Sequence, residues 1–227
     1  MTDPQQRPGI PDARDSAAAL GDRPLAFYNA LLTEHFVLES ARGITVSESS
    51  SRASLYLMTL SSGLVAFGFL AATPYAGVFL GVVIPVIVIL GVFTYERLVQ
   101  TSLEDVAALA SIQRIRRYYG GLLPGADEFF PVPQGSAPNE LLEIGQRGYR
   151  RGVFFTISSA IAIVNSIVAG VGIALLVYWP SRNLAIAVVV GVLGALVLIV
   201  LHGAYQESRY FRQRRLLSAD PTAPAPR

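Results

Sequence analysis

The sequence has no cysteine, no lysine and few charges of either sign. Without cysteine, the chain has no disulfide, no thiolate metal ligand and no cysteine nucleophile. The 18 residues with a positive side chain are all arginine. Charged residues make up 15% of the chain, whereas an ordinary soluble domain has about a quarter. Because a soluble protein of this size needs a more polar surface, the composition favours a membrane protein.

Motifs that indicate chemistry are also missing. The chain has no glycine-rich phosphate loop, no His-Glu-x-x-His, no Gly-x-Ser-x-Gly and no acidic cluster suited to a divalent metal. No basic stripe with interleaved aromatic residues indicates a nucleic-acid partner. His35 and His202 stand alone, and we interpret each as an interfacial side chain. The sequence therefore predicts a protein that is not an enzyme, with no catalytic residue, cofactor, metal site or nucleic-acid partner.

Two long stretches of the chain are almost free of charge. Residues 53–95 contain no Asp, Glu or Arg and are broken once, at Thr73-Pro74-Tyr75. Residues 152–206 contain one charged residue, Arg182, within the break at 179–183. Each of the four resulting segments has roughly 20 residues, enough for a helix to cross about 30 Å of hydrocarbon. A soluble core helix of this length would have a polar stripe, and these have none.

The expected fold is an all-α integral membrane protein with four transmembrane helices in two hairpins and helical cytoplasmic extensions. The alternative is a buried four-helix core of a soluble protein. The expected divisions are a disordered tail at 1–23, an amphipathic helix and helix start at 24–52, the first hairpin at 53–95, cytoplasmic helices and a loop at 96–151, the second hairpin at 152–206, and a basic helix with a disordered tail at 207–227.

The segment before the first span is predicted to contain two helices. The first begins at Pro24, has Leu25, Tyr28, Leu32 and Phe36 on one face and stops at Gly43. This apolar face needs the membrane, the rest of the chain or a partner to cover it. Thr45-Val46-Ser47-Glu48 then has the pattern of a capping box that starts the first spanning helix.

The sequence LLTEHFVLESARGITVSESSSRASLYL, which leads into the first span, resembles the corresponding segment of uncharacterised four-span bacterial membrane proteins of the actinomycete type. The resemblance covers about 30 residues. It implies a location in a bacterial membrane and no particular activity.

The other predicted extensions are continuations of spans. The second span is expected to continue as one long helix to Tyr119, where Gly120-Gly121 ends it. A further helix is predicted to begin at Asn139 and to run straight into the third span. The last span is expected to continue to Leu217.

Arginines are distributed unevenly around the predicted spans. The two hairpin turns contain only Arg182, and all the other arginines near span ends lie on the opposite side. Cytoplasmic segments of membrane proteins have an excess of arginine. We therefore predict a multi-pass protein of the cell membrane with both termini in the cytoplasm. Tyr75, Tyr178 and Trp179 at the turns suit the outer interface.

Small residues recur at four-residue spacing in three spans, which allows close contact between helix backbones in lipid. The sequence leaves open whether these contacts form within one chain or between copies in a homo-oligomer. The predicted packing residues are Gly77, Gly81, Ala162, Ser166, Gly170, Ala187, Gly191 and Ala195.

Two further residues stand out within the spans. Asn165 is strongly polar and is expected to bond to a neighbouring helix, with the lining of a permeation path as the alternative. Pro85 is expected to kink the second span, with a gating hinge as the alternative. A Thr-x-Ser-Ser pattern that begins at Thr59 and again at Thr156 hints at duplication of the two hairpins.

No Asp, Glu, Lys or Arg lies at mid-membrane depth, where ion-coupled transporters usually need such groups. The function we expect is a non-enzymatic membrane scaffold or interaction protein whose long cytoplasmic helices bind a protein partner. The alternative is a small channel or membrane-perturbing effector with a mostly apolar pore along Pro85 and Asn165. A transporter or lipid-modifying enzyme is a third hypothesis, for which no residue can be nominated.

Overall fold

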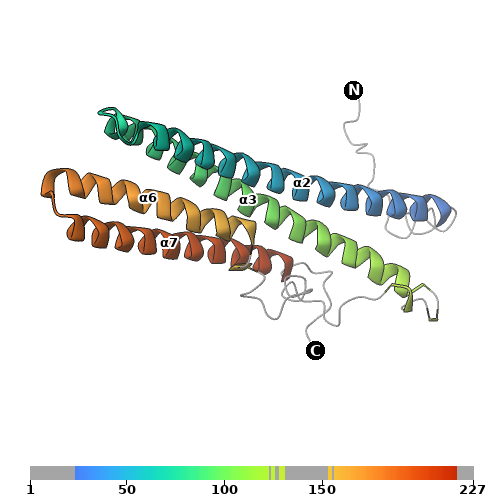
Figure 1. Cartoon of the computed structure of the whole chain (residues 1–227). Helices are drawn as coiled ribbons and strands as arrows, with labels where there is room; N and C mark the ends of the chain where they lie inside the picture. The colour runs from blue at the N-terminus through green and yellow to red at the C-terminus, as the bar shows by residue number, and fades with distance from the viewer. Residues whose placement is uncertain (1–23, 123, 126–127, 131–152, 155, 219–227) are drawn as a thin grey trace, which may run out of the picture.

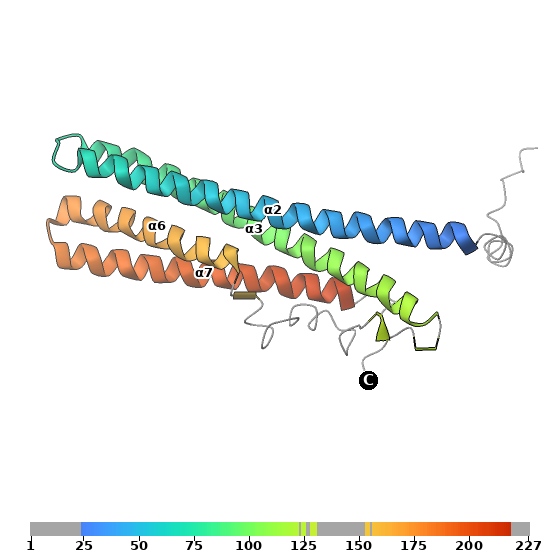
Figure 2. The ribbon, with the colours of Figure 1, turned by 45° about the vertical axis from the view of Figure 1, so that its right-hand side comes forward.

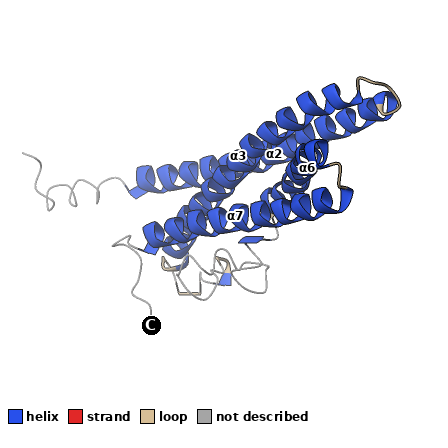
Figure 3. Cartoon of the chain, turned by 90° about the vertical axis from the view of Figure 1, so that its left-hand side faces the viewer, coloured by secondary structure: helices blue, strands red, loops and turns tan. Residues whose placement is uncertain are grey.

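A computed structural model describes residues 24–122, 124–125, 128–130, 153–154 and 156–218. These residues form four long helices and no strand (Figures 1 and 3). The predicted tails at 1–23 and 219–227 lie outside the described residues, as does most of the segment between the second and third spans. The helices are α2 (Pro24–Leu70), α3 (Ala76–Gly120), α6 (Ile157–Ser181) and α7 (Leu184–Ser218).

All four helices are long and apolar enough to cross a membrane. Their large apolar side chains face outward: Phe69 is 83% exposed, Leu176 77% and Val200 68%. A soluble protein rarely exposes contiguous apolar surface on this scale. The surroundings that suit these helices are therefore lipid, and the chain has the features of a multi-pass membrane protein.

The helices associate in sequence order. Helix α2 packs along α3, α6 packs along α7, and α3 joins the two pairs through its contact with α6. The turn between α2 and α3 and the turn between α6 and α7 lie at the same end of the molecule (Figure 1). At the other end, α2 and α3 extend beyond the start of α6 (Figure 2). We call this extension, residues 24–52 of α2 and 96–120 of α3, the arm.

Helix α2 does not stop at Gly43, and this corrects the expected division into two helices. The Thr45 hydroxyl donates to the carbonyl of Arg42, 2.8 Å away, instead of capping a new helix. On either side of the glycine, Arg42 bonds to Asp105 and Ser49 bonds to Thr101 of α3. These contacts support the helix on both sides of a glycine, which costs about 1 kcal/mol inside a helix relative to alanine.

Helix α3 matches the expected course. It runs through Pro85 and past the apolar segment to Gly120, where the Gly121 amide donates to the carbonyl of Arg117 at 3.1 Å. The side chain of Pro85 is exposed on the outer surface of the helix.

The third span begins differently from the prediction. Thr156 has an extended backbone (φ −114°, ψ 163°), and its hydroxyl accepts a hydrogen bond from the Ser159 amide, so it is the N-cap of α6. The prediction that one helix runs without interruption from Asn139 into the third span is therefore wrong, because α6 begins after Thr156. Thr59, the matching residue of the suggested duplication, lies inside α2 and bonds to the Leu55 carbonyl. The two Thr-x-Ser-Ser patterns thus have different structural roles.

Candidate functional site

Asn165 joins three helices within the apolar part of the molecule. Its side-chain nitrogen donates to the Val88 carbonyl of α3, and its oxygen accepts from the Tyr56 hydroxyl of α2, both at 3.2 Å. Asn165 and Tyr56 are both buried. Gly91 makes room for the amide, because a Cβ at position 91 would overlap it. These bonds favour a packing role for Asn165 over the lining of a permeation path.

Pro85 is not part of this cluster. Its ring lies on the exposed side of α3, whereas Asn165 faces the interior. The structure therefore does not bring the two residues together along one pathway.

The small residues of α6 and α7 meet within one chain. A Cβ on Gly170 would lie 2.7 Å from the Gly191 carbonyl oxygen and 2.8 Å from the Ala195 Cβ, and one on Gly191 would lie 2.7 Å from the Gly170 carbonyl oxygen. Only glycine fits where two backbones come this close. Ala162 and Ala187 are also buried.

Three members of the predicted packing set have other surroundings. A Cβ at Gly77 or Gly81 would meet nothing within 4 Å, so these residues do not face a neighbouring helix in the described part of the chain. Ser166 is buried, and its hydroxyl donates to the Ala162 carbonyl of its own helix at 2.7 Å.

His202 of α7 contacts α3. The Tyr95 hydroxyl donates to the His202 carbonyl at 2.6 Å, and the two rings meet edge to face. One turn further along α7, Gln206 is buried, and its amide donates to the Val153 carbonyl and to the Thr156 hydroxyl. This contact secures the chain where α6 begins.

A belt of charged groups lies where the apolar segments end. The Glu48 carboxylate accepts from Arg97 at 3.0 Å and from Arg52 at 2.8 Å. These hydrogen bonds, that of Arg97 first, lower the pKa of Glu48. Glu96 accepts in turn from Tyr205 at 2.6 Å and from Arg209 at 3.2 Å, which links α3 to α7. The belt consists of Glu48, Arg52, Glu96, Arg97, Tyr205 and Arg209.

Beyond the belt, the two helices of the arm meet along a largely polar seam. The less exposed residues of α2 follow a four-three spacing, which is that of a coiled-coil contact. Ser49 bonds to Thr101 at 2.9 Å, and Arg42 bonds to Asp105 at 2.8 Å. The seam residues on α2 are Leu31, His35, Leu38, Arg42, Thr45 and Ser49.

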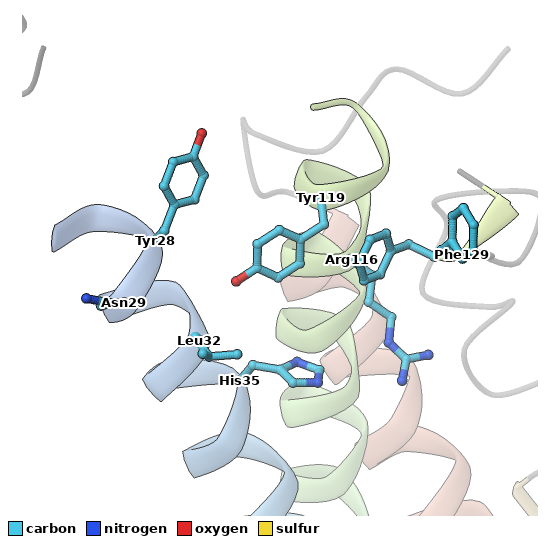
Figure 4. A pocket seen from close by; sticks show the side chains of 8 residues that line it. Tyr28, Asn29, Leu32, His35, Arg116, Tyr119 and Phe129 are labelled. Carbon is cyan, nitrogen blue, oxygen red and sulfur yellow. The ribbon is translucent and has the colours of Figure 1, made fainter. Parts of the chain in front are cut away.

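A cavity of about 570 Å³ lies near the end of the arm (Figure 4). Helix α2, helix α3 and the segment after α3 all contribute to its walls. In Figure 4 the His35 imidazole and the Arg116 guanidinium lie at one level along the helices, and the rings of Tyr119 and Phe129 lie at another. The lining residues are Tyr28, Asn29, Leu32, His35, Arg116, Tyr119, Phe129 and Phe130.

Two polar side chains, Arg116 and His35, bear on the chemistry of this cavity. Arg116 lies 4.0 Å from the Glu39 carboxylate, the outer limit of an ion pair. The Nδ1 atom of His35 is buried and has no hydrogen-bond partner in the described part of the chain. The cavity thus combines a cationic end with an aromatic end.

Sequence reasoning found the apolar face of α2 but not this cavity. A sequence signal was present in Phe129-Phe130, an aromatic pair in a loop rich in proline and glycine. Within the described ranges, no three His, Asp or Glu side chains are grouped so as to hold a metal ion.

Comparison with models of known protein families, with curated proteins and with solved structures finds no match to this chain.

Proposed function

We propose that this chain is a multi-pass scaffold or interaction protein of the cell membrane. Its spanning helices form two hairpins, and its arm is presented to a protein partner on the cytoplasmic side. The observation behind this proposal is the uncovered apolar face of α2 within the arm, where Phe36 is 65% exposed and Val37 is 55% exposed.

The apolar side of α2 in the arm faces away from α3. The seam toward α3 is occupied largely by polar and charged groups, and the larger apolar side chains point outward. Burial of apolar surface contributes roughly 25 cal/mol per Å², so leaving these residues in water is unfavourable. A groove on another protein that receives an apolar helix face removes this penalty.

Lipid does not cover this face if the belt marks the membrane boundary. Phe36 precedes Glu48 by 12 residues, which is about 18 Å along a helix. The arginine distribution supports a cytoplasmic position for the arm, because the turns at the opposite end contain only Arg182.

Site-specific photocrosslinking in living cells tests the proposal. A benzophenone amino acid at Phe36 should give a discrete adduct with a partner protein. The same amino acid at Glu34, about 160° around the helix and also exposed, should not. Equal adduct patterns at both positions, or no adduct at Phe36, would contradict the proposal. Ion conductance by the purified protein in planar bilayers would favour the channel alternative instead.

A further inference from the structure

The cavity at the end of the arm is open to solvent on one side, and its volume is that of a small-molecule site. Its volume of about 570 Å³ lies within the range of about 300–1,000 Å³ typical of ligand pockets. Such pockets combine apolar and aromatic walls with a few polar groups that orient the ligand. Here Leu32, Tyr119, Phe129 and Phe130 supply the walls.

The polar groups at one end favour an anion. Arg116 has its carboxylate neighbour, Glu39, only at 4.0 Å, and both side chains are more than a third exposed. Its guanidinium therefore keeps donors available for a planar acid or a phosphate. The His35 ring also lines the cavity at this level. A ligand oxygen there would accept from the Arg116 guanidinium and lie beside the imidazole.

The groups at the other end favour a ring. Tyr119 and Phe130 lie with their ring centroids 5.4 Å apart, and Phe129 is 80% exposed. Aromatic side chains in this arrangement offer faces and edges for stacking on a planar ligand. In Figure 4 the aromatic level and the cationic level are separated along the helices, as the two ends of an amphipathic ligand would need.

The position of the cavity argues against a lipid headgroup. Arg116 follows Tyr95 by 21 residues, which is about 31 Å along α3. A headgroup layer adds only about 5–8 Å to each side of the hydrocarbon. The ligand must therefore come from the aqueous phase.

We infer that this cavity binds a small planar aromatic anion, with the charged group between Arg116 and His35 and the ring among Tyr119, Phe129 and Phe130. A nucleoside monophosphate and an aromatic carboxylate share this chemistry. The inference does not depend on the protein partner proposed above.

Equilibrium dialysis of the full chain in lipid nanodiscs, with empty nanodiscs as the blank, tests the inference. The probes are AMP and indole-3-carboxylate, and adenosine and inorganic phosphate report on the ring and the anion alone. At least one of the first two should bind with a Kd below about 1 mM, and adenosine and phosphate should each bind about tenfold more weakly. A preference for AMP or for the carboxylate identifies the source of the anion.

Variants locate the site. Arg116→Gln should weaken binding of the preferred probe by about tenfold, and Phe129→Ala should weaken it by a similar factor. Arg114→Gln, which changes an exposed arginine of the same helix outside the cavity, should leave binding unchanged. Circular dichroism checks that each variant keeps its helix content.

Three results would overturn the inference. One is the absence of binding of both AMP and indole-3-carboxylate below about 1 mM. Another is equal binding by Arg116→Gln and Arg114→Gln. The third is phosphate binding as tight as AMP binding, which would show a simple anion site without a role for the aromatic walls.

Discussion

Two helix contacts of this chain are formed by different groups. One is the contact between α6 and α7, and the other is the contact between α2 and α3 in the arm. In the first, Gly170 and Gly191 bring two backbones so close that a Cβ on either would lie 2.7 Å from the carbonyl oxygen of the other. In the second, side chains hold the helices, with Arg42 bonded to Asp105 and Glu48 bonded to Arg97.

With the proposed topology, the α6–α7 contact lies in lipid and the arm lies in water, and the two contacts differ as these solvents require. In lipid, apolar contact gives no net drive for helices to associate, so close packing and a few hydrogen bonds must hold them. In water, charged groups can be solvated when the helices part, so exposed ion pairs contribute little energy but fix the register. The α6–α7 contact should therefore be sensitive to volume, and the arm should be sensitive to charge and backbone propensity.

The largest expected effect is that of Gly191→Leu. The new side chain would enter the crossing beside Gly170 and Ala174, and overpacking of this kind costs about 1–3 kcal/mol. Thermal aggregation in detergent should therefore begin at a lower temperature. Because both helices belong to one chain, the size on a sizing column should not change.

Val190→Leu is the matched control. Val190 is 37% exposed, and lipid tails are as apolar as leucine, so this change should be nearly neutral. If Gly191→Leu instead lost a large species, the crossing would lie between subunits. Equal behaviour of the two variants would show that the small-residue contact is not important for stability.

The next effect concerns Asn165, a buried polar link between the two helix pairs. Asn165→Ala removes its bonds to Tyr56 and Val88, and such bonds contribute about 0.6–1.7 kcal/mol in membrane proteins. Gly91→Ala should be destabilising by displacing the same amide.

The double variant sharpens this test. Once Asn165 is alanine, the Cβ at position 91 has nothing to displace, so the two changes should be clearly less than additive in unfolding free energy. Reversible unfolding in mixed micelles would give the unfolding free energies of the native chain, the two single variants and the double variant. Strict additivity would mean that Gly91 does not make room for Asn165.

A smaller effect of opposite sign is expected at Gly43. The residue lies inside α2, and a Cβ there would meet nothing within 4 Å. Gly43→Ala should therefore stabilise the arm by about 0.5–1 kcal/mol, because alanine has less backbone entropy to lose. Limited proteolysis of the arm should slow down. Faster cleavage would indicate that the helix ends at Gly43 after all.

The smallest effect is the dependence of the arm on pH. The pKa of Glu48 is lowered from its ordinary value of 4.5 by its bonds to Arg97 and Arg52. Its contribution to stability is therefore complete above this value and is lost as the pH falls through the lowered pKa. Hydrogen exchange in residues 40–52 should differ between the native chain and Glu48→Gln at pH 6. The difference should shrink at pH 3, and a constant difference would contradict this account.

The apolar segments, the long course of α3 and the bonding of Asn165 to other helices could be predicted because they depend on composition and local pattern. The continuity of α2 at Gly43 could not. Local propensity favours a stop there, and the contacts that support the helix, among them those with Asp105 and Thr101, come from residues about 60 positions away. The capping of α6 by Thr156 was readable in principle, since threonine is a common N-cap. The apolar run continues on both sides of Thr156, so the hydrophobic pattern does not mark a helix start there.

The cavity near His35 was beyond sequence reasoning for a related reason. It forms where α2, α3 and the Phe129-Phe130 segment converge, and this convergence depends on the antiparallel register of two long helices. A shift of one turn along the seam would separate His35 from Arg116. The seam combines Leu31 and Leu38 with polar groups, and its register depends on bonds such as Arg42 to Asp105, between residues far apart in the sequence.

The central claim is that the arm stands in water on the cytoplasmic side, and cysteine accessibility tests it most directly. Because the chain has no cysteine, Glu34→Cys and Tyr75→Cys each introduce a single thiol, at an exposed position of the arm away from the Phe36 face and at the turn between α2 and α3. An impermeant maleimide should label Tyr75→Cys in intact cells and Glu34→Cys only after the membrane is permeabilised. Labelling of Glu34→Cys in intact cells would place the arm outside, and no labelling under either condition would contradict an arm that stands in water.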